Sequence, residues 1–225
     1  IPGHYNPEIE ILRGYWMISW FKKEFASREL LEAQERQMTP EQLLNELLVQ
    51  IPPGSHGLML QPYWGAAFKQ PEGKGAIIGF GDVHTRAHIY RSIIEGINYA
   101  LIDGAERIER KSQRRIARLM VSGGGSQSDI ICQITADMFG RPLCKGVTYE
   151  ASGLGAAICC FVGLGTFPSY EEAVAHMVHH AKVFEPNPDH TEIYGKLFTR
   201  VYKKIYKRLR VLYTEIQDIT KYPEI

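Results

Sequence analysis

Residues 119–142 read LMVSGGGSQSDIICQITADMFGRP, and this stretch decides the fold. A short apolar run ends in three glycines, and an amphipathic helix follows that Gly140 should close. The glycines let the backbone come within contact distance of a flat or anionic ligand, because no side chain blocks the approach. Ser126, Gln127 and Ser128 add polar groups beside the helix N-terminus, where unpaired N–H groups favour a phosphate. A glycine-rich turn is also a plain structural connection, so the residues alone leave both interpretations open.

The segments around this turn alternate between strand and helix patterns. Strand patterns lie at residues 57–64, 75–80, 116–125 and 142–149, and helix patterns at about residues 84–105 and at 128–140. Helices are also expected at residues 11–25, at 39–51 with Thr39 as N-cap, at 169–178 with Ser169 as N-cap, and at about 189–217. The alternation predicts an α/β layered fold.

Composition and length narrow the class of protein. With 225 residues, 44% of them hydrophobic, the chain can form one large core, and we expect one compact domain. The 26 Lys and Arg residues nearly balance 25 Asp and Glu residues, so no net field attracts nucleic acid or an anionic membrane. No CxxC pair occurs among the four cysteines, and Cys159 and Cys160 are expected to be buried in an apolar run. A reduced, cytoplasmic protein is expected.

Two features bear on processing and on membranes. The chain starts at Ile1-Pro2-Gly3 without an initiator Met or a targeting segment, which suggests an excised or processed piece. The apolar stretch at residues 151–167 is shorter than the roughly 20 residues of a membrane span. We therefore expect a buried helix there and no membrane partner.

Two common nucleotide-binding loops do not fit the sequence. GGGSQSD at residues 123–129 lacks the Lys-Ser or Lys-Thr of a Walker A loop, and PEGKGA at residues 71–76 lacks its upstream glycine. Gly153 and Gly155 are not followed by the third small residue of a Rossmann fingerprint. A nucleotide at the glycine turn would therefore need another kind of site.

The turn and its helix, followed by YEASGLGAAICC at residues 149–160, resemble the adenosine-binding segment of the FGGY carbohydrate kinases, the family of glycerol, xylulose and gluconate kinases. The shared features are the glycine turn, a QxxAD helix, and then, in the family's order, Gly140, Pro142, Glu150 and a GAA at residues 155–157. HTRAHIYRSIIEGINYAL at residues 84–101 resembles the helix before this turn, and RGYWMISWF at residues 13–21 resembles the start of the second domain. The resemblance spans nearly the whole chain.

The resemblance implies an α/β fold of the ribonuclease-H-like, actin-like ATPase type, a mixed sheet flanked by helices. The family has two such domains with ATP between them, and this chain is similar to the second. We therefore expect residues 1–225 to form a single C-terminal domain, with a helical leading segment at 1–50, an actin-like core at 51–225, and the N-terminal sugar-binding domain absent. The implied cofactors are ATP and Mg²⁺.

The resemblance also assigns site residues. In the glycine turn, the positions implied to bind nucleotide are Gly123, Gly124, Gly125, Ser126 and Ser128. Gly14 and Ser19 match a segment that approaches the phosphates, although the glycine and the tryptophan are not spaced here as in glycerol kinase. The family's Asp-x-Gly-Thr loop and catalytic aspartate belong to the first domain and have no match, so we expect no catalytic residue and no turnover by this chain alone.

Other candidate sites have ordinary structural explanations. Asp82 ends a strand pattern and is expected to cap the following helix. His84 and His88, like the trio His176, His179 and His180, have helical spacing but lack completing ligands, so we expect partly solvated helix histidines and no metal site.

The basic terminal segment at residues 200–213 has Val201, Ile205, Leu209 and Leu212 at helical spacing. This pattern favours a helix packed on the domain over a nucleic-acid surface.

Two functions from different classes follow. The first is the ATP- or ADP-binding half of a kinase that phosphorylates a sugar or polyol. The second is a non-catalytic actin-like nucleotide-binding or regulatory module. The isolated chain should fold and expose an apolar surface where the first domain packs, so homo-association, such as a homo-dimer, is expected. At Gly124 we expect the backbone to approach the nucleotide at positive φ.

Overall fold

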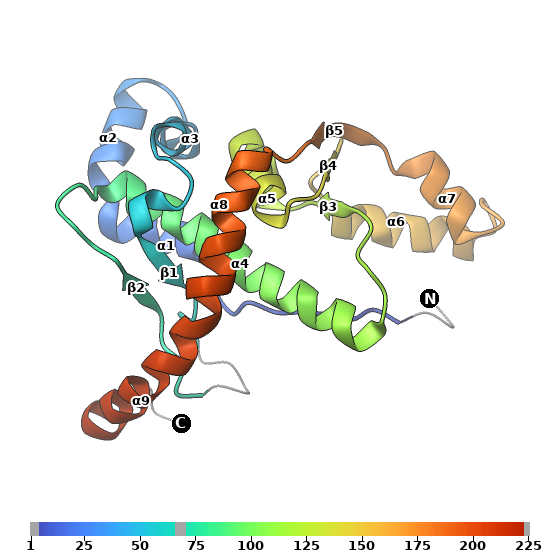
Figure 1. The fold of residues 1–225 in the computed structure, drawn as a ribbon. Coiled ribbons are helices and arrows are strands. Elements are labelled where there is room, and N and C mark those ends of the chain that lie inside the picture. Colours follow the sequence, from blue (N-terminus) through green and yellow to red (C-terminus); the bar gives the residue numbers. More distant parts are fainter. Residues whose placement is uncertain (1–4, 66–70, 223–225) are drawn as a thin grey trace. The chain divides into compact units, whose positions relative to one another are not determined.

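The computed structural model describes residues 5–65 and 71–222, so the first residues, Ile1-Pro2-Gly3, lie outside the described part (Figure 1). The chain forms two compact units: unit 1 comprises Ile1–Ile116 and Pro188–Ile225, and unit 2 comprises Ala117–Asn187. The expectation of a single domain, with a helical leading segment at residues 1–50 and an actin-like core at 51–225, stays a prediction.

Unit 1 is built around one long helix. Its elements are α1 (Trp16–Phe25), α2 (Ser27–Glu35), α3 (Pro40–Gln50), β1 (Met59–Gln61), β2 (Ala76–Ile78) and α4 (Arg86–Ser112). Figure 1 shows α4 in green, with α1, α3 and β1 at its N-terminal part. The sequence predicted α3 with its Thr39 cap, where the Thr39 hydroxyl accepts from the Gln42 N–H and the Gln42 amide oxygen accepts from the Thr39 N–H. The sequence pattern did not predict α2, and the helix predicted at about residues 84–105 ends about two turns before α4 does.

A close approach between α4 and β1 needs a glycine. A Cβ at Gly96 would lie 2.5 Å from the backbone oxygen of Leu60, so any larger residue would push the helix off the strand. β1 pairs with β2 in antiparallel register, with Leu60 opposite Ile77. The buried side of α4, including Ile93 and Ile97, forms much of the core of unit 1.

A buried polar network ties three segments of unit 1 together. The Glu95 carboxylate accepts from Arg91 Nε at 2.8 Å, the Gly54 N–H at 3.0 Å, the Ser55 hydroxyl at 3.0 Å and the Tyr194 hydroxyl at 2.8 Å. Arg91 also donates to Tyr194 and to two backbone oxygens at the end of α3. Burial raises the pKa of Glu95, and the four donors compensate for that burial.

The C-terminal part of unit 1 is helical with one irregular turn. Helix α8 (Pro188–Leu197) continues through a π-helical turn (Phe198–Tyr202) into α9 (Lys203–Thr220). At the π turn, Tyr202 stacks on Tyr99 of α4 with ring centroids 5.0 Å apart. The α9 residues that pack inward are Ile205 and Tyr213, whereas Leu212 is 55% exposed. The expectation that Leu212 packs on the domain is wrong, because the inward stripe of α9 runs at four-residue intervals through Ile205 and Leu209 to Tyr213.

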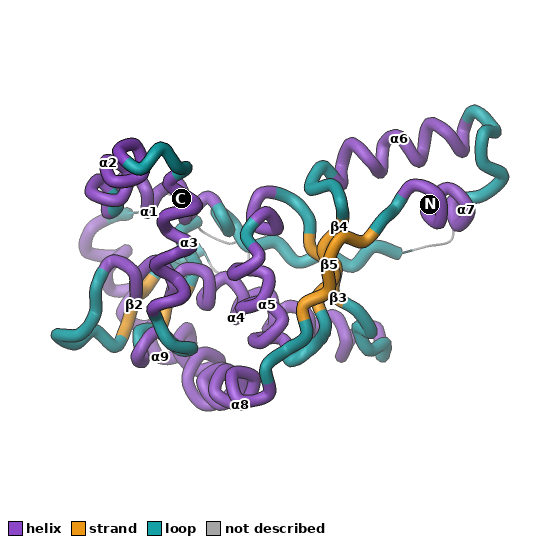
Figure 2. Tube along the Cα trace, turned by 90° about the horizontal axis from the view of Figure 1, so that it is seen from above, coloured by secondary structure: helices purple, strands orange, loops and turns teal. Residues whose placement is uncertain are grey.

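Unit 2 contains a mixed three-stranded sheet. Strands β3 (Leu119–Val121) and β4 (Leu143–Gly146) are parallel, and β5 (His180–Phe184) is antiparallel to β4. Figure 2 shows the three strands side by side, with α5 (Asp129–Phe139) on one side and with α6 (Ala151–Gly163) and α7 (Tyr170–Met177) on the other. The mixed sheet confirms the predicted fold class. The sequence did not reveal β5, because its HAKVF pattern carries charge.

The core of unit 2 lies between the sheet and α5. It contains Cys132 and Ala136 of α5 with Leu143 and Phe184 of the strands, and Leu119 and Val121 pack against it. Gly140 ends α5 in the left-handed conformation, as the sequence predicted.

Helix α6 is more exposed than the sequence predicted. Residues 151–163 do form a helix, but Ile158 is its single buried residue, and Cys159 and Cys160 are exposed. The apolar composition indicated burial, yet α7 is the main element packed on α6, and it covers only one side. In the described part of the chain, no helix combines the length and the apolar character needed to span a bilayer.

Candidate functional site

Two loops leave the same edge of the sheet in unit 2. Because β3 and β4 are parallel, with Val121 opposite Lys145, the glycine turn after β3 and the loop at residues 147–150 after β4 emerge together. The Gly123 N–H donates to the Tyr149 backbone oxygen at 3.0 Å, which holds the two loops in contact. Ligands of open α/β sheets bind outside the carboxyl ends of the strands, so this edge is the candidate site.

The glycine turn has one position that demands glycine. Gly123 has φ 80° and ψ −173°, a region that is essentially restricted to glycine. Gly124 is the first residue of a 3-10 turn (Gly124–Gln127), its φ is not positive, and a Cβ there would meet no atom within 4 Å. The expectation of positive φ at Gly124 is therefore wrong, and the strained position is its neighbour. The open space above Gly124 is what a close backbone approach requires.

The serines of the turn stabilise it. The buried Ser126 donates from its N–H and its hydroxyl to the Gly123 backbone oxygen, at 3.1 and 2.7 Å. Ser128 is the N-cap of α5, and its hydroxyl accepts from the Ile131 N–H at 3.3 Å. The hydroxyl proton of Ser126 is thus used inside the turn, so a ligand contact from Ser126 would use its oxygen as an acceptor. Direct nucleotide contact by either serine stays a prediction.

A charged trio lies at the start of α5. Asp129, the first residue of the helix, accepts from Lys145 Nζ at 2.9 Å and from Lys182 Nζ at 2.7 Å. These two hydrogen bonds lower the pKa of Asp129. Lys145 and Lys182 face each other across β4 and β5, so the carboxylate also separates two like charges. The sequence alone did not indicate this trio, because only the strand register brings the lysines together.

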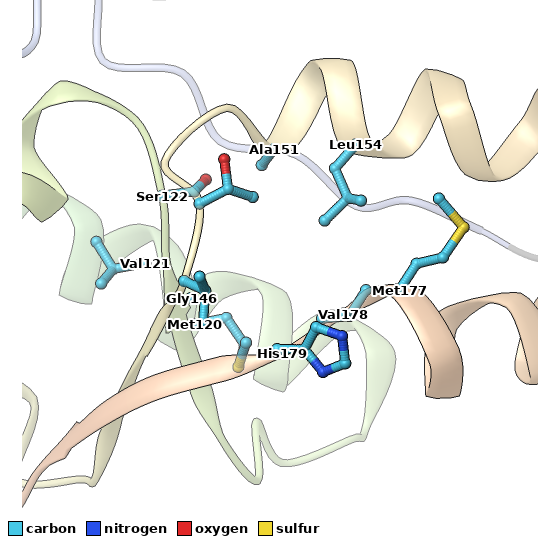
Figure 3. A pocket seen from close by; sticks show the side chains of 11 residues that line it. Met120, Val121, Ser122, Gly146, Ala151, Leu154, Met177, Val178 and His179 are labelled. Atoms are coloured by element: carbon cyan, nitrogen blue, oxygen red, sulfur yellow. The ribbon is translucent and has the colours of Figure 1, made fainter.

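A cavity of about 350 Å³ opens beside the same edge, on the side of α6 and α7 (Figure 3). Its polar side chains are Ser122, Thr148 and His179, and its apolar ones include Met120 and Leu154. None of the glycines of the turn lines it. The cavity and the glycine turn are therefore separate features of the edge.

Gly14 and Ser19 belong to unit 1. Gly14 lies in the turn before α1, where its N–H donates to the Ile11 backbone oxygen at 3.0 Å, and Ser19 is an exposed residue of α1. The N-terminus of α1 has no side-chain cap and no acidic residue in its first turn. The Met17 and Ile18 N–H groups already donate to the backbone oxygens of Gly14 and Tyr15. The phosphate role of Gly14 and Ser19 stays a prediction.

The other candidates take structural roles. Asp82 lies in a turn, and Thr85 is the N-cap of α4, so Asp82 is not the expected cap. His179 and His180 lie beyond α7, which removes the helical spacing with His176.

His88 is buried, and its Nε2 lies 2.9 Å from His56 Nδ1, so the expectation of a partly solvated residue is wrong. Burial, with His56 and His84 nearby, lowers the pKa of His88 and keeps it neutral. Within residues 5–65 and 71–222, no group of three His, Cys, Asp or Glu side chains could hold a metal ion.

Comparisons with known proteins agree with the geometry. The sequence model of the FGGY family of carbohydrate kinases, C-terminal domain, matches residues 12–164. The chain is 31% identical over 209 residues to the sugar kinase YgcE of Escherichia coli K12, covering 93% of this chain and 42% of that protein. It is also 31% identical to a xylulose kinase of Staphylococcus epidermidis, covering 96% of this chain and 42% of that enzyme.

Solved structures give the same result. A xylulose kinase from Rhodospirillum rubrum superposes with a TM-score of 0.73 at 26% identity, covering 88% of this chain and 38% of that one. A ligand-bound xylulose kinase from Lactobacillus acidophilus gives a TM-score of 0.74 at 25% identity, covering 89% of this chain and 39% of that one. The chain spans about two fifths of the length of the curated relatives that it matches. With a family model that covers well over half of its residues, the chain belongs to the FGGY family of carbohydrate kinases and carries that family's C-terminal domain.

Proposed function

We propose that this chain is the nucleotide-binding part of a kinase that transfers the γ-phosphate of ATP to a hydroxyl of a sugar or polyol. The observation that carries the proposal is the glycine turn at the carboxyl edge of β3 and β4. There Gly123 takes a glycine-only conformation, and the backbone at Gly124 has open space above it. A flat nucleoside can approach such a backbone, and the turn lies inside the segment that matches the kinase family.

The capping of α5 favours the nucleoside over the phosphates at the glycine turn. The N-terminus of α5 is already capped by Ser128, and the Asp129 carboxylate there is paired with Lys145 and Lys182. A phosphate at this helix end would find fewer free N–H groups. A neutral base or ribose does not depend on those N–H groups. We therefore assign adenosine to residues 123–128.

Magnesium would enter with the nucleotide. Among the described residues no cluster of three His, Cys, Asp or Glu side chains could hold an ion by itself. Kinases commonly bind Mg²⁺ through one or two carboxylates and the phosphates of the substrate. The contribution of this chain is to bind and orient the nucleoside, so that the γ-phosphate has a defined position.

The sugar and the base that accepts its proton are assigned to the part of the kinase outside this chain. Relatives of the chain include xylulose kinases and gluconokinases, so five- and six-carbon sugars and sugar acids are the first substrates to test. In this proposal the kinase acts in the cytoplasm on ATP and such a sugar.

The test uses the complete kinase polypeptide that contains this chain. ADP release is measured with ATP, Mg²⁺ and a panel of xylulose, gluconate and glycerol, and nucleotide binding is measured separately by calorimetry. Turnover with one sugar, together with ATP binding, is the expected result. A folded protein that binds ATP but phosphorylates nothing would instead support the non-catalytic nucleotide-binding module. A folded protein that binds no nucleotide would contradict both functions.

A further inference from the structure

The glycine turn carries three polar side chains, and two of them already have a role in the fold. Ser126 is buried, and its hydroxyl donates to the Gly123 backbone oxygen at 2.7 Å. Ser128 caps α5, where its hydroxyl accepts from the Ile131 N–H at 3.3 Å. Gln127, between the two serines, is exposed, and its side-chain amide forms no hydrogen bond with the described residues. Within the turn, Gln127 is therefore the residue whose polar groups can serve a ligand.

The geometry of the turn places Gln127 on the same face as Gly124. Residues Gly124–Gln127 form a 3-10 turn, which has three residues per turn, so positions i and i+3 lie one above the other. Gly124 and Gln127 have this spacing, whereas the buried Ser126 points into the protein. A rise of about 2 Å per residue puts Gln127 about 6 Å along the turn from Gly124. A flat ligand that lies over Gly124 would therefore have one edge beside the Gln127 amide.

The surroundings of this face indicate which kind of ligand edge Gln127 can contact. A Cβ at Gly124 would meet no atom within 4 Å, so the backbone beside Gln127 is bare. Ser122, the residue before the turn, lines the separate cavity on the side of α6 (Figure 3). The carboxylate that follows the turn, Asp129, is paired with two lysines. An amide that donates and accepts at the same time suits the edge of a neutral heterocycle.

We propose that Gln127 selects adenine over 6-oxo purines: its Oε1 atom accepts from the 6-amino group, and its Nε2 atom donates to ring nitrogen 7. This inference rests on the proposed function, because it takes residues 123–128 as the adenosine site. Adenine presents a donor and an acceptor on this edge, so a Gln amide forms two hydrogen bonds with it. A 6-oxo purine presents two acceptors on the same edge, so Oε1 finds no donor there. The amide therefore distinguishes the two kinds of base.

Two other roles for the Gln127 amide predict different results. An amide that contacts the ribose strengthens the binding of every purine ribonucleotide equally, because the ribose is the same in all of them. An amide that stays in water strengthens the binding of none. Only a contact with the edge of the base changes the preference between two bases. The decisive quantity is therefore the ratio of two nucleotide affinities.

The test measures nucleotide affinity by calorimetry in the complete kinase, without sugar. ADP is compared with inosine diphosphate, in which an oxygen replaces the 6-amino group, and with 7-deaza-ADP, in which a carbon replaces ring nitrogen 7. Gln127→Ala removes the amide from an exposed position, so we expect the variant to fold. Gln127→Met keeps the length of the side chain without the amide and takes its place if Gln127→Ala does not fold. Gln50→Ala, which removes an exposed amide at the end of α3, is the matched control.

We expect the wild-type kinase to bind ADP at least about 10-fold more tightly than inosine diphosphate, a difference of about 1.4 kcal/mol. It should also bind ADP more tightly than 7-deaza-ADP, because the acceptor of the Nε2 donor is then absent. In Gln127→Ala, weaker ADP binding should reduce both ratios to about 2-fold or less. Gln50→Ala should keep the wild-type ratios.

Three results would overturn the inference about Gln127. They are a wild-type kinase that binds ADP and inosine diphosphate equally, an unchanged ratio in the folded Gln127 variant, and an equal loss of affinity for both nucleotides, which indicates a ribose contact. Each of them leaves the proposed function in place, because the kinase still binds nucleotide. A folded wild-type kinase that binds neither nucleotide would instead contradict the proposed function, and this inference with it.

Discussion

Helix α4 of unit 1 and helix α6 of unit 2 are both rich in apolar residues, but their surroundings differ. Helix α4 is buried along most of its first four turns, and even its charged pair, Arg91 and Glu95, is enclosed and fully hydrogen-bonded. Helix α6 has a single buried residue, Ile158. Apolar composition therefore identifies a helix that needs a partner, and the partner itself has to be found in the structure. Unit 1 contains the partners of α4, whereas α6 and β3 keep an uncovered side.

The largest effect expected from this contrast is in unit 1. Glu95→Ala leaves the Arg91 guanidinium buried without its carboxylate and removes the acceptor of the Gly54 and Ser55 donors. Removing one partner of a buried ion pair costs about 3–5 kcal/mol, so the free energy of unfolding should fall by that amount in urea titrations. Glu192→Ala removes an exposed pair with Lys196 and is the control that should change little. A loss below about 1 kcal/mol for Glu95→Ala would show that the network does not hold unit 1 together.

A smaller effect is expected at the glycine turn of unit 2. Gly123→Val forces a β-branched residue into the conformation φ 80°, ψ −173°, and such strain costs about 1–3 kcal/mol. Thermal unfolding followed by circular dichroism measures the loss. Gly124→Ala is the matched control, because its Cβ enters open space and its φ is not positive, so stability should stay within about 0.5 kcal/mol of the original. Equal stability of Gly123→Val and Gly124→Ala would remove the distinction between the two glycines.

The smallest effect concerns the trio at α5. The lysine hydrogen bonds lower the folded-state pKa of Asp129, so its stabilisation is present above the unfolded pKa of about 3.9 and is lost as the pH falls through the folded pKa. Asp129 is half exposed, which limits the effect to about 0.2–1 kcal/mol. Asp129→Asn should therefore be less stable at pH 7 and equal to the original near pH 2. A difference that persists at low pH would have to arise from something other than the ion pairs.

How much could be predicted differs between the two units. Local signals were sufficient where they act over a few residues: Thr39 and Pro40 gave the start of α3, and Gly140 gave the end of α5. The glycine turn was predicted for the same reason, as a strand that runs into three glycines. The position of the strained residue was not, because φ at Gly123 depends on the hydrogen bond to Tyr149 in another loop.

Features set by distant residues were missed. Strand β5 contains polar and charged side chains, and its sequence shows no strand pattern. The trio of Asp129, Lys145 and Lys182 forms only because the register of β5 with β4 brings the two lysines together. The exposure of α6 could not be predicted either, because composition says that a helix can be buried but not whether this chain supplies a cover. The roles of Gly14 and Ser19 stay predictions, since they depend on a bound nucleotide.

The central claim is that the backbone at Gly124 approaches the nucleotide, and Gly124→Val in the complete kinase tests it most directly. A Cβ at Gly124 would meet no atom within 4 Å and φ there is not positive, so we expect this variant to fold without the strain of Gly123→Val. Calorimetric titration with a non-hydrolysable ATP analogue should show an affinity lower by about 10-fold or more, at least about 1.4 kcal/mol, with unchanged sugar binding and an unchanged unfolding midpoint. Wild-type nucleotide affinity in the folded variant would contradict the claim and remove the glycine turn from the nucleotide site.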